Sequence, residues 1–490
     1  MSVGLRELAL LNDSLSYSPS HGESHGICDG TPLKRRKCVY RRHTNFAMES
    51  IEQTFNGAAS WNKKVTCTIS RNGDLIHRTY LRVQLPDVVV GNNKAFRWLN
   101  WLGHVLVKSV EVEIGGQRID KHYSDWLQIW NELTQTAGHQ LGYANMVGNI
   151  PSLVNPTENK TGSDVVVKGQ TLYIPLQFWF NRNPGLALPL IALQYHEVKI
   201  NLELRAAKEC FWAGAWSTDH WATDASAVTV GDLQSASLFV DYIYLDTDER
   251  RRFAQVSHEY LIEQLQFTGD ESTATVNNKI KMNFNHPCKE LIWVVQPDAN
   301  VDGAVAPFGA QYFNYTDDFD VTYQATSAYS VEDAYGGGAS VAAPHVGSDI
   351  ENLAGGMPGI AAGGANRVFI PTSFEGGDNP VATGLIQLNG HDRFSAMDGR
   401  YFNLVQPFQH HENVPSRGIN VYSFGLKPEE HQPSGTCNMS RIDSATLNLT
   451  LTPKTVNYNG SPRTAKIRIY AVNYNVLRIM SGMGGLAFAS

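Results

Sequence analysis

The sequence predicts an all-β protein with two similar domains in tandem, and three observations support this prediction. Short aromatic or β-branched runs alternate with turn signals, most clearly over residues 388–453. The 490 residues exceed the roughly 250–300 that one hydrophobic core usually serves. The triplet Ile51-Glu52-Gln53 recurs as Ile262-Glu263-Gln264, and a Phe and a Gly follow each copy. A β-rich repeat of about 200 residues indicates two similar domains.

Composition and charge argue against several classes of function. The formal net charge of −7 and the pI near 6.1 argue against a coat that neutralises nucleic-acid phosphates. No apolar run approaches the ~18–20 residues that span a bilayer, and we expect no signal peptide, because the first residues lack its basic and apolar regions. The six cysteines have no CxxC spacing, so buried, reduced thiols are expected.

Residues 1–40 form a Ser-, Gly- and His-rich stretch that ends in the basic cluster Lys34-Arg35-Arg36-Lys37. This composition predicts an arm and not a domain. The basic cluster fits a nuclear-import or nucleic-acid patch, but a solvated or inter-subunit arm is the favoured interpretation.

The first half continues with strands, expected over residues 47–55, 65–70, 75–85 and 106–114. The pair Asn72-Gly73 predicts a hairpin between the second and third of these. A short helix with Ser124 as its N-cap comes next, and its aromatic stripe is interpreted as core. The stripe consists of Tyr123, Trp126, Leu127, Trp130 and Leu133.

Residues 138–169 are rich in Asn, Gly and Pro, which predicts a long loop. Two strands are expected around Asn183-Pro184-Gly185, the first with alternating apolar residues over 172–180. Another loop carries three tryptophans, Trp212, Trp216 and Trp221.

A charged stretch over residues 246–252 breaks the apolar pattern, which makes it the expected domain boundary. Each half is expected to end in a pair of strands, followed by a charged or polar segment. The first pair is 198–204 with 238–245, and the second is 445–451 with 466–476.

In the second half, runs over residues 401–405, 419–424 and 445–451 predict antiparallel strands. Residues 335–366 are dense in Gly, Ala and Pro and predict an exposed surface loop. The tail over residues 477–490 is apolar and Gly-rich, so we expect it to lie on a neighbouring surface.

The sequence offers little chemistry for catalysis or cofactor binding. Gly336-Gly337-Gly338 lacks the Lys-Ser/Thr of a phosphate loop, and no serine lies in a GxSxG elbow. His410-His411-Glu412 is the most metal-like cluster, but adjacent strand residues point to opposite faces, so a site needs a further ligand. Asp392, Asp398 and Glu412 are interpreted as turn and surface residues. We therefore expect no catalytic residue, cofactor or metal ligand.

Several asparagines lie in N-x-S/T sequons, which matter only if the chain meets a glycosylation machinery. Among them are Asn12, Asn159, Asn314, Asn438 and Asn448. The last four are kept as glycosylation candidates.

Long strings of the sequence resemble a known family. They include NFAMESIEQTFNG, IPLQFWFNRNPGLALPLIALQYHEVKI, NGHDRF, DGRYFNLVQP, VPSRGINVYSF and PEEHQPSGTCN. The chain resembles the major capsid proteins of large icosahedral nucleocytoplasmic DNA viruses, of the phycodnavirus and iridovirus type. The resemblance covers nearly everything from Val39 to Ser490 apart from the Gly-rich loop and some shorter ones, whereas the arm departs from it.

The resemblance implies an all-β fold of two tandem eight-stranded jelly-roll domains with short helices in loops. With the boundaries above, the arm is 1–40, the first jelly roll 41–247, the second 248–476 and the tail 477–490. The family can carry glycans, though not necessarily at such sequons.

The resemblance further implies a structural, non-enzymatic protein of the virion's outer shell, assembled in the host cytoplasm. Three chains are expected to form a pseudo-hexagonal capsomer that contacts neighbouring capsomers and minor capsid proteins. The arm is expected to contact minor capsid proteins or an internal membrane, and no direct nucleic-acid contact is expected.

Two other classes remain open on the residues alone. A carbohydrate-binding jelly-roll surface protein fits the aromatics and the β content. A cupin-like metalloenzyme fits the His cluster, although the His-x-His pattern of cupins is missing.

Overall fold

The computed structural model describes residues 45–160, 162–216, 221–306, 308–319, 377–458 and 460–488. The predicted arm, Asn12 and the Gly-rich loop over 335–366 lie outside the described residues. No helix within these ranges is long and apolar enough to cross a membrane.

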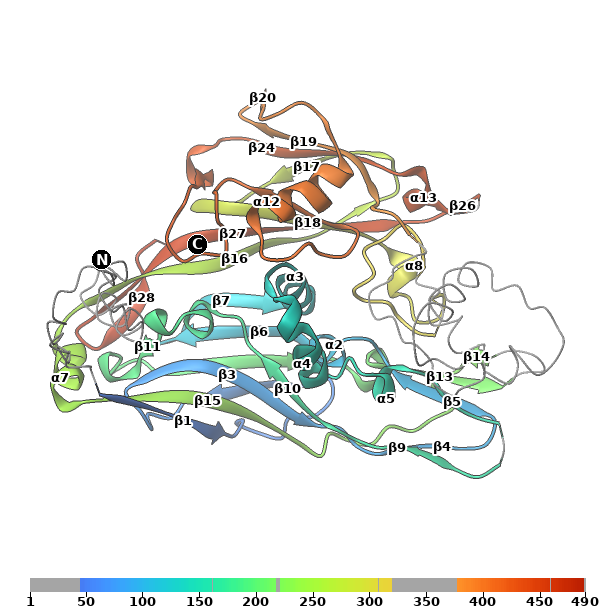
Figure 1. The fold of residues 1–490 in the computed structure, drawn as a ribbon, viewed down its shortest axis with the longest axis horizontal. Helices are drawn as coiled ribbons and strands as arrows, with labels where there is room; N and C mark the ends of the chain where they lie inside the picture. Colours follow the sequence, from blue (N-terminus) through green and yellow to red (C-terminus); the bar gives the residue numbers. More distant parts are fainter. Residues whose placement is uncertain are drawn as a thin grey trace, which may run out of the picture.

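The first half of the chain folds into a sandwich of two antiparallel sheets, which fills the lower part of Figure 1. One sheet has the order β1-β15-β3-β10 and the other the order β2-β12-β6-β7. Their bounds are β1 (Phe46–Gln53), β2 (Lys64–Thr68), β3 (Leu75–Gln84), β6 (Val107–Ile114), β7 (Gln117–Tyr123), β10 (Thr171–Pro175), β12 (Val198–Leu204) and β15 (Ser235–Leu245).

The second half repeats this sandwich above the first (Figure 1). Its sheets have the orders β16-β27-β18-β22 and β17-β24-β19-β20, with β21 also pairing with β19. Their bounds are β16 (His258–Thr273), β17 (Asn277–Met282), β18 (Pro287–Pro297), β19 (Val381–Leu388), β20 (His391–Asp392), β21 (Met397–Asp398), β22 (Ile419–Ser423), β24 (Ala445–Leu451) and β27 (Ala465–Met480).

The two sandwiches share one topology. When the eight strands of each are lettered B to I in chain order, with β20 and β21 together as one strand, both have the sheets B-I-D-G and C-H-E-F. This is the arrangement of a jelly roll. The predicted fold class, two tandem eight-stranded jelly rolls, is confirmed.

Short elements fill the connections between these strands. In the first jelly roll they are β4 (Val88–Val90), β5 (Lys94–Trp98), α2 (Leu102–Leu106), α3 (Ser124–Thr134), α4 (Ala137–Val147), α5 (Pro151–Val154), β8 (Thr157–Asn159), β9 (Val165–Val167), α6 (Trp179–Arg182), η1 (Pro184–Leu186), β11 (Leu188–Pro189), η2 (Leu190–Ala192), η3 (Ala207–Glu209), β13 (Phe211–Trp216) and β14 (Trp221–Thr223). Helix α7 (Thr247–Gln255) leads into β16. In the second they are α8 (Asp298–Val301), η4 (Tyr401–Val405), α12 (Gln406–His410), β23 (Cys437–Asn438), η5 (Met439–Arg441), α13 (Pro453–Val456), β25 (Asn457–Tyr458) and β26 (Ser461–Pro462), and β28 (Met483–Leu486) ends the fold.

The predicted strand over 401–405 is wrong, because η4 is a single π-helical turn that continues into α12. Tertiary contacts override the strand propensity of this aromatic run. Phe402 is fully buried with its ring 5.0 Å from that of Trp293, and Asn403 donates hydrogen bonds to the carbonyls of Ser416 and Ile419.

The predicted strand over 172–180 is too long, since β10 ends at Pro175 and residues 179–182 form helix α6. The Asn181 side chain fixes this turn: it accepts the Phe178 N–H at 3.2 Å and donates to the Thr79 hydroxyl.

Two predicted loops contain regular structure. Residues 138–169 include α4, α5, β8 and β9, and the tryptophan-rich loop includes β13 and β14. Gly and Pro residues there mark the ends of helices and do not exclude them. Gly148 has a φ of 85° at the end of α4, and Pro151 begins α5.

Three further predictions need correction. Asn72-Gly73 joins strands of different sheets, so it is a crossing between sheets and not a hairpin. The expected terminal pairs, β12 with β15 and β24 with β27, likewise lie in opposite sheets. Ser124 is the first helical residue of α3, and its hydroxyl donates to the His104 carbonyl instead of capping the helix.

The apolar tail forms a hairpin of β27 with β28 that lies against the first jelly roll of the same chain. The Tyr195 N–H donates to the Gly482 carbonyl at 2.9 Å, and the His196 ring nitrogen Nδ1 lies 2.9 Å from the Gly484 carbonyl oxygen. The surface beneath the hairpin therefore belongs to the same chain.

Candidate functional site: the junction of the two jelly rolls

The two jelly rolls meet on the outer face of the β16-β27-β18-β22 sheet. Along β18, Trp293 lies in the core of the second jelly roll, whereas Ile292 and Val294 belong to the hydrophobic cluster of the first. Along β27, Ile469 and Tyr470 are divided in the same way. Alternate residues of these strands point to opposite faces, so both faces of this sheet are buried.

Helix α3 and strand β7 supply the aromatic side of the junction. The Trp126 ring lies 5.8 Å from that of Tyr470, which stacks on Phe267 at 4.9 Å. Tyr123 meets Phe267 edge-on at 5.1 Å. The prediction that this stripe is core is confirmed for Trp126, Leu127, Trp130 and Leu133, which are buried. Much of the core is shared between the two jelly rolls.

Asp125 links α3 to two parts of the second jelly roll. Its carboxylate lies 3.2 Å from Arg468 Nη1 and accepts the Tyr315 hydroxyl at 3.0 Å. Arg468 also pairs with Asp270 at 3.0 Å. On β7, the Asp120 carboxylate accepts the Leu265 N–H at 3.1 Å.

A buried ionic cluster lies beside these contacts. Glu263 forms ion pairs with Arg182 of the first jelly roll at 2.8 Å and with Lys289 of its own at 2.7 Å. The Arg182 guanidinium also lies 3.7 Å from the centre of the Trp130 ring. Lys289 is 1 % exposed and donates to the Pro428 carbonyl. Buried charges require such partners, because an unpaired one has lost its hydration.

His411 joins this cluster through two carboxylates. Its Nε2 lies 2.9 Å from Glu290 Oε2, an ion pair whose angle departs from hydrogen-bond geometry, and its Nδ1 lies 2.8 Å from Glu429 Oε1. Burial alone would lower the pKa of His411, but the two carboxylates raise it to about 9. Burial alone would raise the pKa of Glu290, but His411 and Lys289 hold it below its usual value. The pair is therefore ionised at neutral pH.

The structure separates the residues of the metal-like cluster. His410 ends helix α12, with its Nδ1 2.9 Å from the Leu426 carbonyl oxygen, whereas His411 is engaged by Glu290 and Glu429. Residues 406–410 are helical, so the strand geometry considered for His410-His411-Glu412 does not apply. Among the described residues, no group of three or more His, Cys, Asp or Glu side chains could hold a metal ion.

The other candidate carboxylates make local contacts. Asp392 accepts the Gln387 side-chain amide at 2.7 Å, and Asp398 accepts the Arg400 N–H at 2.8 Å. The Glu412 N–H donates to Glu429 at 3.0 Å.

The four sequon asparagines within the described residues differ in exposure. Asn159 and Asn314 are 1 % and 3 % exposed, and their side-chain amides donate to Val90 and to Gln311. Asn438 and Asn448 are half-buried on β23 and β24. Glycosylation stays a prediction, and the latter two are the more accessible acceptors.

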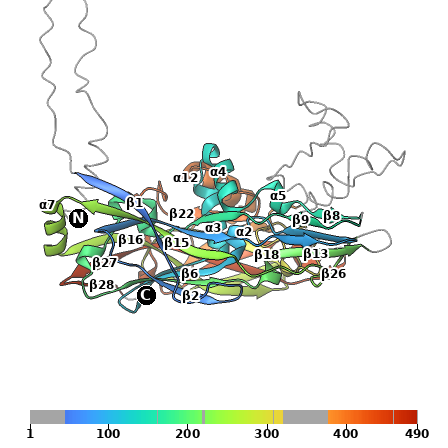
Figure 2. The same cartoon turned by 90° about the horizontal axis from the view of Figure 1, so that it is seen from below.

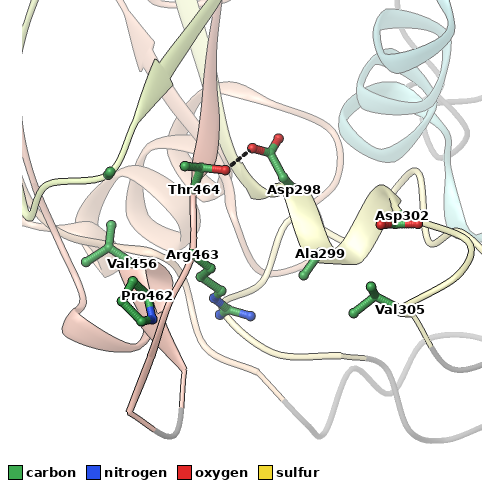
Figure 3. Close-up of a pocket in the computed structure, with 9 residues that line it drawn as sticks. Asp298, Ala299, Asp302, Val305, Val456, Pro462, Arg463 and Thr464 are labelled. Atoms are coloured by element: carbon green, nitrogen blue, oxygen red, sulfur yellow. Dashed lines mark hydrogen bonds between the residues drawn. The ribbon is translucent and has the colours of Figure 1, made fainter.

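An open hollow of about 400 Å³ lies at one end of the second jelly roll, beside α8 (Figure 3). Its charged residues are committed to the fold: Thr464 donates to Asp298, and Arg463 donates to the carbonyls of Thr455 and Lys454. The hollow therefore presents few free polar groups to a ligand.

Sequence reasoning missed the ionic cluster. One signal was available, because Lys289 and Glu290 are adjacent charges in the otherwise apolar run PCKELIWVVQP. Charges in a buried strand pattern indicate buried ion pairs. Arg182 gave no comparable signal.

Two family models match consecutive parts of the chain. "Major capsid protein N-terminus" matches residues 36–246, and "Large eukaryotic DNA virus major capsid protein" matches residues 249–485.

Curated relatives are similar over nearly their whole length. A major capsid protein of Phaeocystis pouchetii virus is 52 % identical, over 93 % of this chain and 95 % of the relative. That of Paramecium bursaria Chlorella virus 1 is 39 % identical, over 97 % and 99 %.

Solved structures agree with this similarity. The chain in a quasi-atomic model of the PBCV-1 virus capsid is 38 % identical, with a TM-score of 0.64 over 93 % of this chain and 100 % of that one. The Faustovirus major capsid protein, 12 % identical, has a TM-score of 0.66 over 97 % of each chain and shows the shared fold.

Proposed function

The chain belongs to the major capsid proteins of large eukaryotic DNA viruses, and we propose that it builds the virion shell as a homotrimeric capsomer. It is a structural protein of the virion. In this capsomer, three chains bring six jelly rolls together. The resulting pseudo-hexagonal outline allows capsomers to pack side by side in a shell.

One observation supports the trimer above the others. Both halves have the same B-I-D-G and C-H-E-F sheets, and they are joined through a large buried junction. The two jelly rolls of one chain are similar and have a fixed relative orientation. If the contact between them is repeated between chains, the chains form a closed ring.

We further propose that the protein is not an enzyme, that it assembles in the host cytoplasm, and that residues 1–40 contact minor capsid proteins or an internal membrane. The junction supports the first of these proposals. Its charged groups form ion pairs with one another and hold the two jelly rolls together, as expected of a structural protein.

The solution mass of the purified full-length chain tests the trimer. Light scattering after size exclusion should give three times the 54.2 kDa of one chain. A monomer at all accessible concentrations would contradict the proposal.

A further inference from the structure

The internal junction shows how one jelly roll covers the next. The outer face of the second B-I-D-G sheet (β16-β27-β18-β22) is covered by α3, which lies in the F-to-G connection of the first jelly roll. Trp126 and Trp130 on α3 share one hydrophobic cluster with Ile292 and Tyr470 on that sheet. One F-to-G helix thus packs on one B-I-D-G sheet.

Among the described residues, the equivalent sheet of the first jelly roll is covered at one end, where Leu75 and Ile243 pack with Ala187 and with Phe253 of α7, but its β1 side is exposed. Strand β1 is exposed from Phe46 to Ser50, and Phe46 and Met48 are 42 % and 48 % exposed. Glu52, Phe239 and Tyr80 lie side by side across β1, β15 and β3, and none of them is buried. In contrast, β18 in the second jelly roll is buried from Cys288 to Pro297.

The equivalent helix of the second jelly roll also lacks a partner among the described residues. Its F-to-G connection is η4 and α12, on which Leu404, Val405 and Phe408 are 44 %, 40 % and 78 % exposed. Leu426 is 72 % exposed and lies beside them, since its carbonyl oxygen contacts His410. Figure 2 shows that α12 and α4 project from the same side of the molecule.

We propose that the η4–α12 ridge (Leu404, Val405, Phe408 and Leu426) docks on the outer face of the β1-β15-β3-β10 sheet of a second copy of this chain. This rests on the proposed function and specifies its contact surfaces. A second copy fits as the partner, because the same two kinds of surface already meet within the chain. There, the F-to-G helix of the first jelly roll packs on the B-I-D-G sheet of the second. The contact is head-to-tail, so three copies close a ring of six jelly rolls.

The chemistry of the two surfaces is complementary. The ridge offers four large apolar side chains without charge. The sheet offers apolar and aromatic groups together with the ion pair of Glu52 and Arg82, whose charged groups lie 3.8 Å apart.

Substitutions on each surface test the contact. F408E on the ridge and M48E on the sheet should each lower the solution mass from three chains to one. V89E is the matched control, because Val89 is 51 % exposed on β4, far along the first jelly roll from β1 (Figure 1), and it should leave the trimer intact. Circular dichroism and the unfolding midpoint should show that all three variants fold.

A cross-link tests direct contact. The double variant F408C/M48C and the two single variants are each treated with a short bismaleimide. Two-chain and three-chain products in the double variant, beyond those of either single variant, support the head-to-tail contact, and their absence contradicts it. A link from position 48 to residues 1–44 of its own chain would instead show that the arm covers β1 and would overturn the proposal.

The outcomes separate the two proposals. A monomeric wild-type chain overturns the trimer and with it this contact. A wild-type trimer that persists in both F408E and M48E overturns only the contact.

Discussion

His411 Nε2 lies 2.9 Å from Glu290 Oε2, and both side chains are 0 % exposed. The imidazolium is stable there because two carboxylates compensate for its lost hydration. The ion pair joins the F-to-G connection of the second jelly roll to strand β18, next to the surface that meets the first.

Stability is expected to fall as the pH rises from 6.5 to 9. The pKa of His411 is raised from 6.5 to about 9, so its contribution is complete below pH 6.5 and is lost as the pH rises through 9. At 1.36 kcal/mol per pKa unit, this is at most roughly 3 kcal/mol. Urea unfolding at pH 6 and at pH 9 measures it. The variant His411→Gln should be less stable at pH 6 and should lose most of this pH dependence.

Glu132 is expected to hold the two jelly rolls together. Its carboxylate accepts the Ser416 N–H at 2.9 Å and the Ser416 hydroxyl at 2.5 Å. Glu132→Ala should cost about 2 kcal/mol of unfolding free energy, as expected for bonds to a charged acceptor. Lys108→Ala, which removes an exposed ion pair with Glu203, is the control and should cost under about 0.5 kcal/mol. Faster amide exchange over residues 411–417 should accompany only the first change.

Gly418 is expected to tolerate no side chain. Its φ is 95°, and an added Cβ would lie 2.0 Å from the Tyr315 carbonyl oxygen. Gly116 has a similar φ of 87° but nothing within 4 Å, so Gly116→Ala isolates the backbone strain, about 1 kcal/mol. Gly418→Ala should lower the unfolding free energy by several times that amount. Equal losses in the two variants would show that the close approach has no cost.

The buried thiols are expected to resist alkylation in the folded protein. Burial raises the pKa of Cys67 to about 11 and that of Cys210 to about 12, which leaves little thiolate at pH 8. Iodoacetamide followed by peptide mass spectrometry should modify both only after unfolding. Cys437, which is half-buried, should react before them. Rapid labelling of Cys210 in the native state would contradict its burial.

The strand pattern predicts elements where one face of the strand meets a core. The alternation of β24 and β6, and the aromatic stripe of α3, follow directly from the spacing of apolar residues. The pattern fails at 401–405 and 179–182, where aromatic residues pack as helical turns into connections between strands. At these two places, tertiary contacts outweigh the strand propensity of the residues. The contacts are the packing of Phe402 against Trp293 and the hydrogen bonds of Asn181.

The sequence alone indicates that the chain is all-β, that it contains two similar units and that it resembles a capsid family. These properties depend on local patterns and on strings of residues. The tertiary fold is what brings one cluster together from Arg182, Glu263, Lys289, Glu290 and His411. Those residues come from four distant segments, and charged side chains carry no periodic signal of where they meet. They lie close together because the two jelly rolls pack against each other. That packing depends on the burial of residues that are distant in the sequence, and the spacing of neighbouring residues carries no information about it.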